Sequence, residues 1–320
     1  MTARTHVLVP LDGSELAKDA LTLARSLVGS SGQVTLLQVA RHSAPLRDAA
    51  GVEIVPEEIV GEWILKEARE NLSDVARTFS DTVAPGVDVV THVVSGDPAG
   101  AILLAAEEYR ADFIVMTSHA RGAVGRAAFG SVTDRVARTA TIPVIITRPE
   151  LGDRTKAYPG VRRIIVPRDR SNRSNEALPV AKAMAQNLDS SIHLVHVIDT
   201  FSSYMAVTGA PISQPLLDEW YADSRHDLET AAADLIAAGI ETTWAVYQGS
   251  TVANLCEIAE QSDLIVMTSH GRSGFTRWLI GSIAEKLVRT APVPVCLVPA
   301  RHEAPAEAFA PFTNLQALEI

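Results

Sequence analysis

The chain has 320 residues, of which 47% are hydrophobic and 21% are charged, and its formal net charge at pH 7 is −10. This composition is typical of a soluble protein with enough apolar material for two cores, and the acidic balance argues against a broad nucleic-acid-binding face. No run approaches the ~18 apolar residues of a membrane span, and the N-terminus lacks the apolar stretch of a signal peptide, so we expect a cytoplasmic protein. Cys256 and Cys296 lie in apolar stretches, which favours core positions over a redox role.

Short apolar runs alternate with helical patterns along the first half of the chain. The runs fall at residues 6–11, 33–40, 87–94, 112–117 and 143–147. Nearly continuous apolar character over a few residues is typical of strands that are buried on both faces of a parallel sheet. After the first run, one helical stripe is formed by Leu16, Ala20, Leu23, Ala24 and Leu27. Ser14 is a candidate N-cap for this helix.

The second half of the chain repeats the first. HVLVPLDGSELAKDAL from His6 is echoed by RIIVPRDRSNRSNEAL from Arg163, and the segment from Asp112 is matched at constant spacing by the segment from Asp263. The repeat has the size of a complete small domain, which is too long for a solenoid unit. We therefore expect two tandem domains at residues 1–150 and 160–300, followed by a C-terminal tail at 301–320.

The element order predicts an α/β fold. Strand, helix and strand follow one another in both copies, which indicates two tandem doubly wound, Rossmann-like domains, each with a five-stranded, mostly parallel sheet. Pro179 requires the first helix of the second copy to begin late or to bend. Long segments from Arg41 and Asp199 run into helices that include Trp63 and Trp220. The closing strands of the two copies would each be an exposed apolar edge, and pairing them would cover both.

A ligand site is expected beyond the carboxyl ends of the strands. There the first βα loop faces the loop across the topological switch point. In the second copy Gly281 and Ser282 precede a helical pattern, so backbone N–H groups, a hydroxyl group and a helix N-terminus converge as in an anion nest. A glycine before a helix is also typical of a plain turn, and no Walker A motif is present.

Several other residues have both a structural and a functional interpretation. His119 and His270 lack a neighbouring catalytic constellation, so a loop-shaping hydrogen bond is favoured over a role as catalytic base. His193 and His196 are three apart in a strand and should point to opposite faces, which argues against a shared metal ion. Two glycines after the third strands either allow close approach of a ligand or form a strand-to-helix turn; they are Gly96 and Gly249. No catalytic residue and no metal site is predicted.

The motifs together resemble those of the universal stress protein family. These motifs are VPLDGS after the first strand, MTSHG followed after nine residues by GS, and the RTAxxPV that closes each copy. The duplication resembles the tandem two-domain members, and the resemblance covers residues 4–149 and 162–299. It implies a five-stranded sheet per domain, a pseudo-dimer of the two domains through their last strands, and, in the nucleotide-binding branch, ATP held by a Gly-x-x-Gly, nine residues, Gly-Ser/Thr pattern.

The nucleotide pattern is incomplete in both copies. Its first glycine is Thr117 in one copy and Thr268 in the other, and its second glycine is Ala120 in the first copy. A Cβ at these positions would cost about 1 kcal/mol if the backbone there had a positive φ. The second copy should therefore keep the better phosphate cradle and the first copy the better nucleoside end. Three arginines are candidate phosphate contacts, although surface arginines are more often solvated: Arg168, Arg170 and Arg272.

By resemblance, Asp12 or Asp169 would face the nucleoside, and Val39 or Val197 would offer backbone groups to the purine edge. The candidate ligand-binding residues are Pro10, Asp12, Val39, Met116, Thr117, His119, Ala120, Gly130, Ser131 and Val132 in the first copy. In the second copy they are Pro167, Asp169, Val197, Met267, Thr268, His270, Gly271, Gly281, Ser282 and Ile283.

Two functions fit these observations. The favoured one is a stress-response protein that binds ATP, with or without Mg²⁺, and that regulates an interaction with slow or no hydrolysis. The alternative is a nucleotide-free interaction scaffold of the same fold. A strongly ATP-consuming enzyme would need a base or an activated nucleophile, and neither is visible. A homodimer is a further candidate assembly, and the sequence does not identify the protein partner.

Overall fold

The structure is a computed structural model that describes residues 4–41, 44–118, 130–148, 160–171, 174–199, 213–261, 263–269 and 280–299. The first half contains β1 (Thr5–Leu11), α1 (Asp19–Val28), β2 (Gly32–Ala40), β3 (Leu46–Arg47), β4 (Glu53–Val55), α2 (Glu57–Ser80), β5 (Asp88–Ser95), α3 (Pro98–Glu108), β6 (Phe113–Thr117), α4 (Ser131–Thr139) and β7 (Val144–Thr147). The second half contains β8 (Arg163–Pro167), α5 (Ala177–Leu188), β9 (Ser191–Ile198), α7 (Gln214–Ala237), β10 (Thr242–Gln248), α8 (Thr251–Ile258), β11 (Asp263–Thr268), α9 (Ser282–Thr290) and β12 (Val295–Val298). Most of the expected linker and the tail at 301–320 lie outside the described residues.

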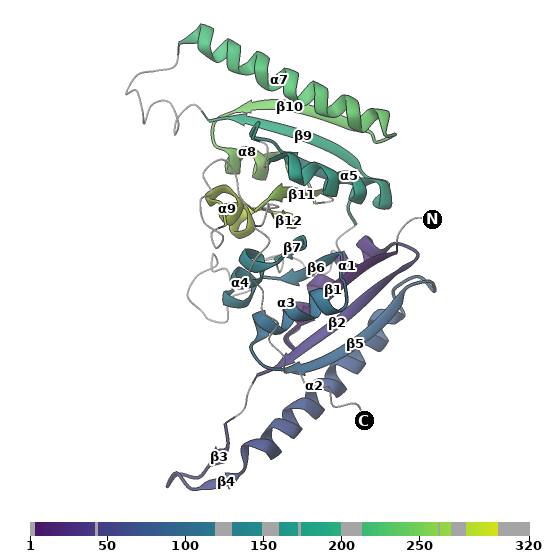
Figure 1. The fold of residues 1–320 in the computed structure, drawn as a ribbon, viewed down its shortest axis with the longest axis vertical. Helices are drawn as coiled ribbons and strands as arrows, with labels where there is room; N and C mark the ends of the chain where they lie inside the picture. Colours follow the sequence, from purple (N-terminus) through teal and green to yellow (C-terminus); the bar gives the residue numbers. More distant parts are fainter. Residues whose placement is uncertain are drawn as a thin grey trace, which may run out of the picture.

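Ten strands form one sheet that runs through both halves (Figure 1). Its order is β10-β9-β8-β11-β12-β7-β6-β1-β2-β5, and the pairs within each half are parallel. Each half therefore has the doubly wound order in which the first strand lies between the second and the fourth. The predicted fold class is confirmed, with the addition that the two five-stranded sheets are continuous.

The halves join through β7 and β12, which pair antiparallel. The register places Val144 opposite Leu297, Ile145 opposite Cys296, and Ile146 opposite Val295. All six side chains are buried, so neither closing strand presents an edge to solvent. The expected pairing of the closing strands is thus present in the structure. Burial among these apolar side chains raises the pKa of the Cys296 thiol.

Helices cover both faces of the sheet and bury two apolar clusters that each extend across the junction. The first cluster includes Leu23 of α1, Leu72 of α2, Met184 of α5 and Leu228 of α7. The second cluster includes helix residues Ile102, Val136, Leu255 and Leu287, from α3, α4, α8 and α9. Alternate residues of β1 enter opposite clusters, as expected for a strand that is buried on both faces. None of the helices in the described ranges combines the length and the apolar character that a membrane span needs.

The first helix of each half begins with a 3-10 turn, which the sequence pattern did not predict. In the first half this turn spans Leu16–Lys18 and α1 begins only at Asp19. The Ser14 hydroxyl accepts a hydrogen bond from the Ala17 N–H at 3.2 Å within this turn, whereas the N-cap position of α1 is Lys18, so Ser14 is not the N-cap of α1. In the second half Pro179 is the third residue of α5, where its missing N–H has no helical acceptor to lose. The helix accommodates this proline by its position within the first turn.

Two histidines near the amino ends of β1 and β9 have a lowered pKa. For His6 and His193 the largest cause is burial, which disfavours the charged imidazolium, and Arg163 further lowers the pKa of His193. His6 Nε2 lies 2.8 Å from Thr35 Oγ1, and His193 Nδ1 lies 2.8 Å from Thr243 Oγ1. The fold therefore favours the neutral form of both imidazoles over the charged form.

We expect the stability of the protein to fall as the pH decreases below about 6.5, because there the unfolded chain binds protons that these two histidines resist in the folded state. The double variant His6→Gln, His193→Gln should flatten the dependence of the urea midpoint on pH between about 7.5 and 5.5. His226→Gln, on the exposed face of α7, is the control. An unchanged pH dependence in the double variant would contradict this assignment.

The junction should be a major source of stability. Ile145 is fully buried where β7 meets β12, so Ile145→Ala should lower the free energy of unfolding by about 2–5 kcal/mol. Ile236→Ala is a matched control, since Ile236 is 56% exposed on α7 and its truncation should change the free energy by less than about 1 kcal/mol. Urea denaturation of both variants measures the difference, and equal losses would refute the importance of the junction.

Candidate functional site

Each half of the structure has a cavity at the carboxyl ends of its strands. The first-half cavity has a volume of about 780 Å³ and the second-half cavity about 510 Å³. Both volumes lie in the range of pockets that hold small molecules and cofactors. The cavities open where the first βα loop of each half meets the N-terminal end of its last helix, which is the expected switch-point position.

The predicted residues that the structure describes converge on these cavities. The first cavity is lined by Pro10, Asp12, Val39, Met116, Thr117, Gly130, Ser131 and Val132. The second is lined by Pro167, Asp169, Val197, Met267, Thr268, Gly281, Ser282 and Ile283. The remaining candidates lie outside the described residues; they are His119, Ala120, His270, Gly271 and Arg272.

The structure adds lining residues that the sequence reasoning missed. The first cavity also contains Gln38, Arg41, Glu67 and Asn71. The second also contains His196, Asp199, Trp220, Ser224 and Thr251. Several of these lie on the two long helices, α2, which packs on β5 and β2, and α7, which packs on β10 and β9. The apolar stripe of each helix was the available signal, because it shows which side of the helix faces the sheet.

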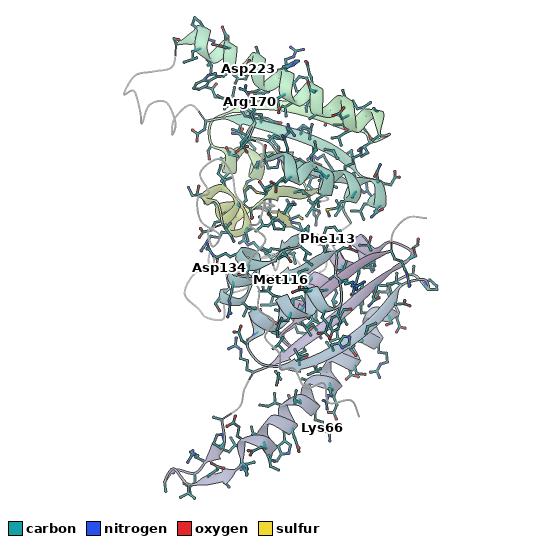
Figure 2. All side chains as sticks on the ribbon, in the orientation of Figure 1. Lys66, Phe113, Met116, Asp134, Arg170 and Asp223 are labelled. Atoms are coloured by element: carbon teal, nitrogen blue, oxygen red, sulfur yellow. The ribbon has the colours of Figure 1, made fainter. Side chains whose placement is uncertain are left out.

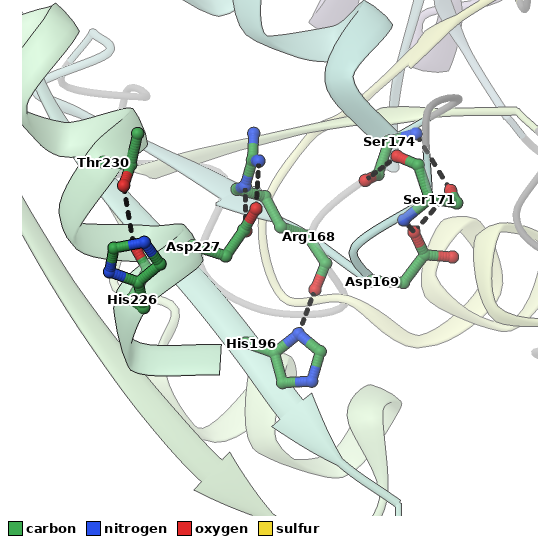
Figure 3. Close-up of polar contacts among 8 residues, drawn as sticks. All are labelled: Arg168, Asp169, Ser171, Ser174, His196, His226, Asp227 and Thr230. Carbon is green, nitrogen blue, oxygen red and sulfur yellow. Dashed lines mark hydrogen bonds and ion pairs between the residues drawn. The ribbon is translucent and has the colours of Figure 1, made fainter. Parts of the chain in front are cut away.

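The aspartate of each first βα loop accepts hydrogen bonds from the loop itself. Asp12 Oδ1 accepts from the Ser14 N–H at 3.0 Å. Asp169 Oδ1 accepts from both the N–H and the hydroxyl of Ser171, at 3.0 and 2.6 Å (Figure 3). Each carboxylate therefore fixes the turn that follows it while lying in the cavity wall.

The positive φ angle in these loops falls at a different position from the one anticipated. Thr117 and Thr268 are the last residues of β6 and β11, and neither has a positive φ, so the backbone cost considered for the lost glycines does not arise at these two positions. The constraint lies instead in the first βα loop, where Gly13 has φ 80° and its counterpart Arg170 has φ 62°. The second half thus places an arginine in a left-handed conformation that favours glycine.

Two arginines of the second half bind α7. The Arg168 guanidinium donates to both carboxylate oxygens of Asp227, at 3.0 and 3.1 Å (Figure 3), and Arg170 donates to Asp223 at 2.9 Å (Figure 2). These contacts occupy the guanidinium groups with helix carboxylates, which disfavours the phosphate-binding role considered for them. We call this pair of ion pairs the α7 clasp. His196 Nδ1 donates to the Arg168 carbonyl oxygen at 2.8 Å and further fixes the loop.

The last helix of each half begins at a glycine N-cap. Gly130 precedes α4 with φ −60° and Gly281 precedes α9 with φ −59°, and neither provides a side-chain acceptor to its helix. The backbone N–H groups of each first turn therefore lie beside a cavity that Ser131 or Ser282 also lines. Such an end attracts an anion through its N–H groups and the positive end of the helix dipole.

Gly96 and Gly249 serve as strand-to-helix turns. They have φ values of 142° and 109°, and their N–H groups donate to the carbonyl oxygens of Ala40 and Ile198, both at 3.0 Å. Neither glycine is among the residues that line the two cavities. This geometry supports the turn interpretation over close approach of a ligand.

No metal centre is apparent in the part of the chain that the structure describes. Within it, no group of three or more His, Cys, Asp or Glu side chains is placed to hold a metal ion. His193 and His196 contact different partners, Thr243 and the Arg168 carbonyl.

Comparison with known proteins identifies the family. The model of the universal stress protein family matches the chain twice, over residues 3–148 and 160–299. A universal stress protein of Mycolicibacterium smegmatis is 25% identical over 237 residues, which span 73% of this chain and 77% of that protein. A universal stress protein of Thermus aquaticus is 33% identical over 143 residues, covering 44% of this chain and 97% of the relative.

A solved structure supports the fold over both halves. The crystal structure of a universal stress protein from Archaeoglobus fulgidus superposes with a TM-score of 0.64 at 22% identity, and the match covers 92% of this chain and 96% of that one. Since the family model matches both copies of the repeat, the chain belongs to the universal stress protein family, with two family units in tandem.

Proposed function

We propose that the protein binds ATP in the cavities at the carboxyl ends of its strands, and that nucleotide occupancy regulates an interaction in a stress response. The observation that carries this proposal is that every described candidate from the nucleotide pattern lines one of the two cavities. These residues come from strands and loops that are far apart in the sequence. Their convergence beside a cavity is what a ligand site requires.

The second cavity offers different chemistry at its two ends. Gly281 and Ser282 supply the N-terminal end of α9, which suits a phosphate group. Val197 lies near the carboxyl end of β9, where backbone groups and apolar neighbours suit a nucleobase edge. A nucleotide lying between these ends would place its charge at the helix and its base at the strand. Mg²⁺ would arrive with the triphosphate, since Mg²⁺ commonly keeps phosphate and water ligands.

A regulatory role with slow or no hydrolysis fits the described lining residues. The imidazole of His196 shapes the loop through its hydrogen bond to Arg168, and Asp169 holds the turn at Ser171. Both groups thus have a structural task in the wall of the cavity. We therefore propose that binding, and not turnover, is the functional event.

A nucleotide-free scaffold of the same fold is the second candidate. The observation in its favour is that Thr117 and Thr268 line the cavities at positions where the nucleotide pattern has glycine. A side chain there narrows the space near the phosphate end. The scaffold function would require a protein partner that binds regardless of nucleotide.

ATP with Mg²⁺ should raise the unfolding temperature of the protein and bind measurably in isothermal titration calorimetry. Gly281→Glu places bulk and negative charge at the N-terminus of α9, so it should weaken ATP binding at the second site at least about tenfold, which corresponds to about 1.4 kcal/mol. Gly130→Glu makes the same change at α4 and serves as the matched variant for the first site.

Circular dichroism of both variants should match that of the unmodified protein. Unchanged ATP affinity in both variants would remove the phosphate-loop assignment. Absence of binding heat and of a thermal shift in the unmodified protein would reject ATP and favour the scaffold.

A further inference from the structure

We infer that the second cavity selects a purine base by stacking it on Trp220, whereas the described lining of the first cavity contains no Trp, Tyr or Phe. This inference rests on the proposed function and adds to it a specificity-determining residue and a difference between the two sites. The evidence is that residues at equivalent positions of α2 and α7 contribute differently to the two cavities.

Trp63 and Trp220 occupy the same position in the duplicated helices. Each is the seventh residue of a 24-residue helix, α2 or α7. Trp63 is 54% exposed and is not among the residues that line the first cavity. Trp220 is partly buried and lines the second cavity. The same residue type at the same helix position therefore faces different surroundings in the two halves.

The two long helices line their cavities with different side chains. In α7 the lining residues are Trp220 and Ser224, which lie one turn apart on one side of the helix, and the Ser224 hydroxyl donates to the Trp220 carbonyl oxygen at 2.7 Å. In α2 the lining residues are Ile64, Glu67, Ala68 and Asn71. The α2 side of the first cavity is thus lined by aliphatic and polar groups, while α7 brings an indole ring to the second.

The α7 clasp is a second difference between the two helices. It ties the first βα loop to α7 through Arg168 with Asp227 and Arg170 with Asp223. The corresponding residues of the first half are Leu11 with Glu70 and Gly13 with Lys66, which cannot form these ion pairs. Figure 2 shows Lys66 on α2 and the Arg170–Asp223 pair at the opposite end of the molecule. The clasped cavity is also the smaller one, at about 510 Å³ against about 780 Å³.

The surroundings of Trp220 suit a flat, apolar group. The second cavity is lined by Val197 and Ile198 at the end of β9, and by Met267 and Ile283. A nucleobase has a π face that stacks on an indole ring, and the larger purine overlaps the ring more fully than a pyrimidine does. Loss of one stacking partner typically weakens nucleobase binding roughly tenfold. Trp220 should therefore discriminate ATP from UTP.

The test compares Trp220→Leu with Trp63→Leu, both in the Gly130→Glu background that closes the first site. Calorimetry with ATP and with UTP gives the affinity of the second site for each nucleotide. Trp220→Leu should weaken ATP binding roughly tenfold and reduce the preference for ATP over UTP, while Trp63→Leu should leave both affinities unchanged. Trp220→Phe keeps an aromatic ring and should restore most of the preference.

The outcomes separate this inference from the proposed function. One outcome is that the Gly130→Glu protein binds ATP and that adding Trp220→Leu leaves its preference for ATP over UTP unchanged. This result would refute stacking on Trp220 and retain the proposed ATP site. If neither the unmodified protein nor Gly130→Glu binds either nucleotide, the proposed function is refuted. A loss of ATP affinity in Trp220→Leu that Trp220→Phe does not restore would also refute stacking, because it would reflect changed packing.

The role of the clasp has its own test. Asp227→Asn removes the charge beside the buried Arg168 with little change in shape, so it should weaken ATP binding at the second site severalfold by loosening α7. In the double variant Asp227→Asn, Trp220→Leu, the ATP affinity of the second site should be little lower than in Trp220→Leu alone, because both changes alter the side of the cavity that α7 lines. A fully additive loss would refute the link between the clasp and Trp220. Asp223→Asn, in the more exposed pair, should have the smaller effect.

Discussion

The antiparallel pairing of β7 with β12 is the contact on which the rest of the architecture depends. Three residue pairs join two five-stranded sheets into one, and their six side chains are buried. Without this pairing each half would expose an apolar edge strand, which is an association hazard. Both helical layers extend their apolar clusters across the same junction. The two cavities therefore belong to a single packed body.

The junction also brings together the helices that close the two cavities. Val136 of α4 and Leu287 of α9 lie in one apolar cluster. The pKa of Arg138 in α4 is raised first by its hydrogen bond to Asp134 and, among weaker contributions, by Glu285 of α9. Charges of one half thus reach the other across the shared core. The last helices of the two halves, α4 and α9, thus pack within one shared apolar cluster.

Much of the fold was predictable from the sequence, because the internal repeat indicates the duplication and the short apolar runs indicate the strands. The rule that ligands bind beyond the carboxyl ends of parallel strands indicated the two loop regions, and the family resemblance supplied individual candidates within them, such as Val39 and Val197. The lining residues of α2 and α7 were missed because the rotation of a helix about its own axis decides which of its residues face a cavity. The sequence alone did not reveal the ion-pair partners of Arg168 and Arg170. These partners, Asp227 and Asp223, lie more than fifty residues further along the chain, so both arginines were available as candidate phosphate contacts.

In the first βα loop the two halves share a backbone feature and differ in side chain. Gly13 and Arg170 both have a positive φ, although an arginine there costs roughly 1–2 kcal/mol more than a glycine. The arginine that adopts this unfavourable conformation, Arg170, also forms the ion pair with Asp223 on α7. In the first half Gly13 instead packs so closely that an added Cβ would lie 3.3 Å from Asn71 Nδ2. The duplicated loop thus contacts its long helix in two ways beside a cavity, by ion pairs in the second half and by close approach in the first.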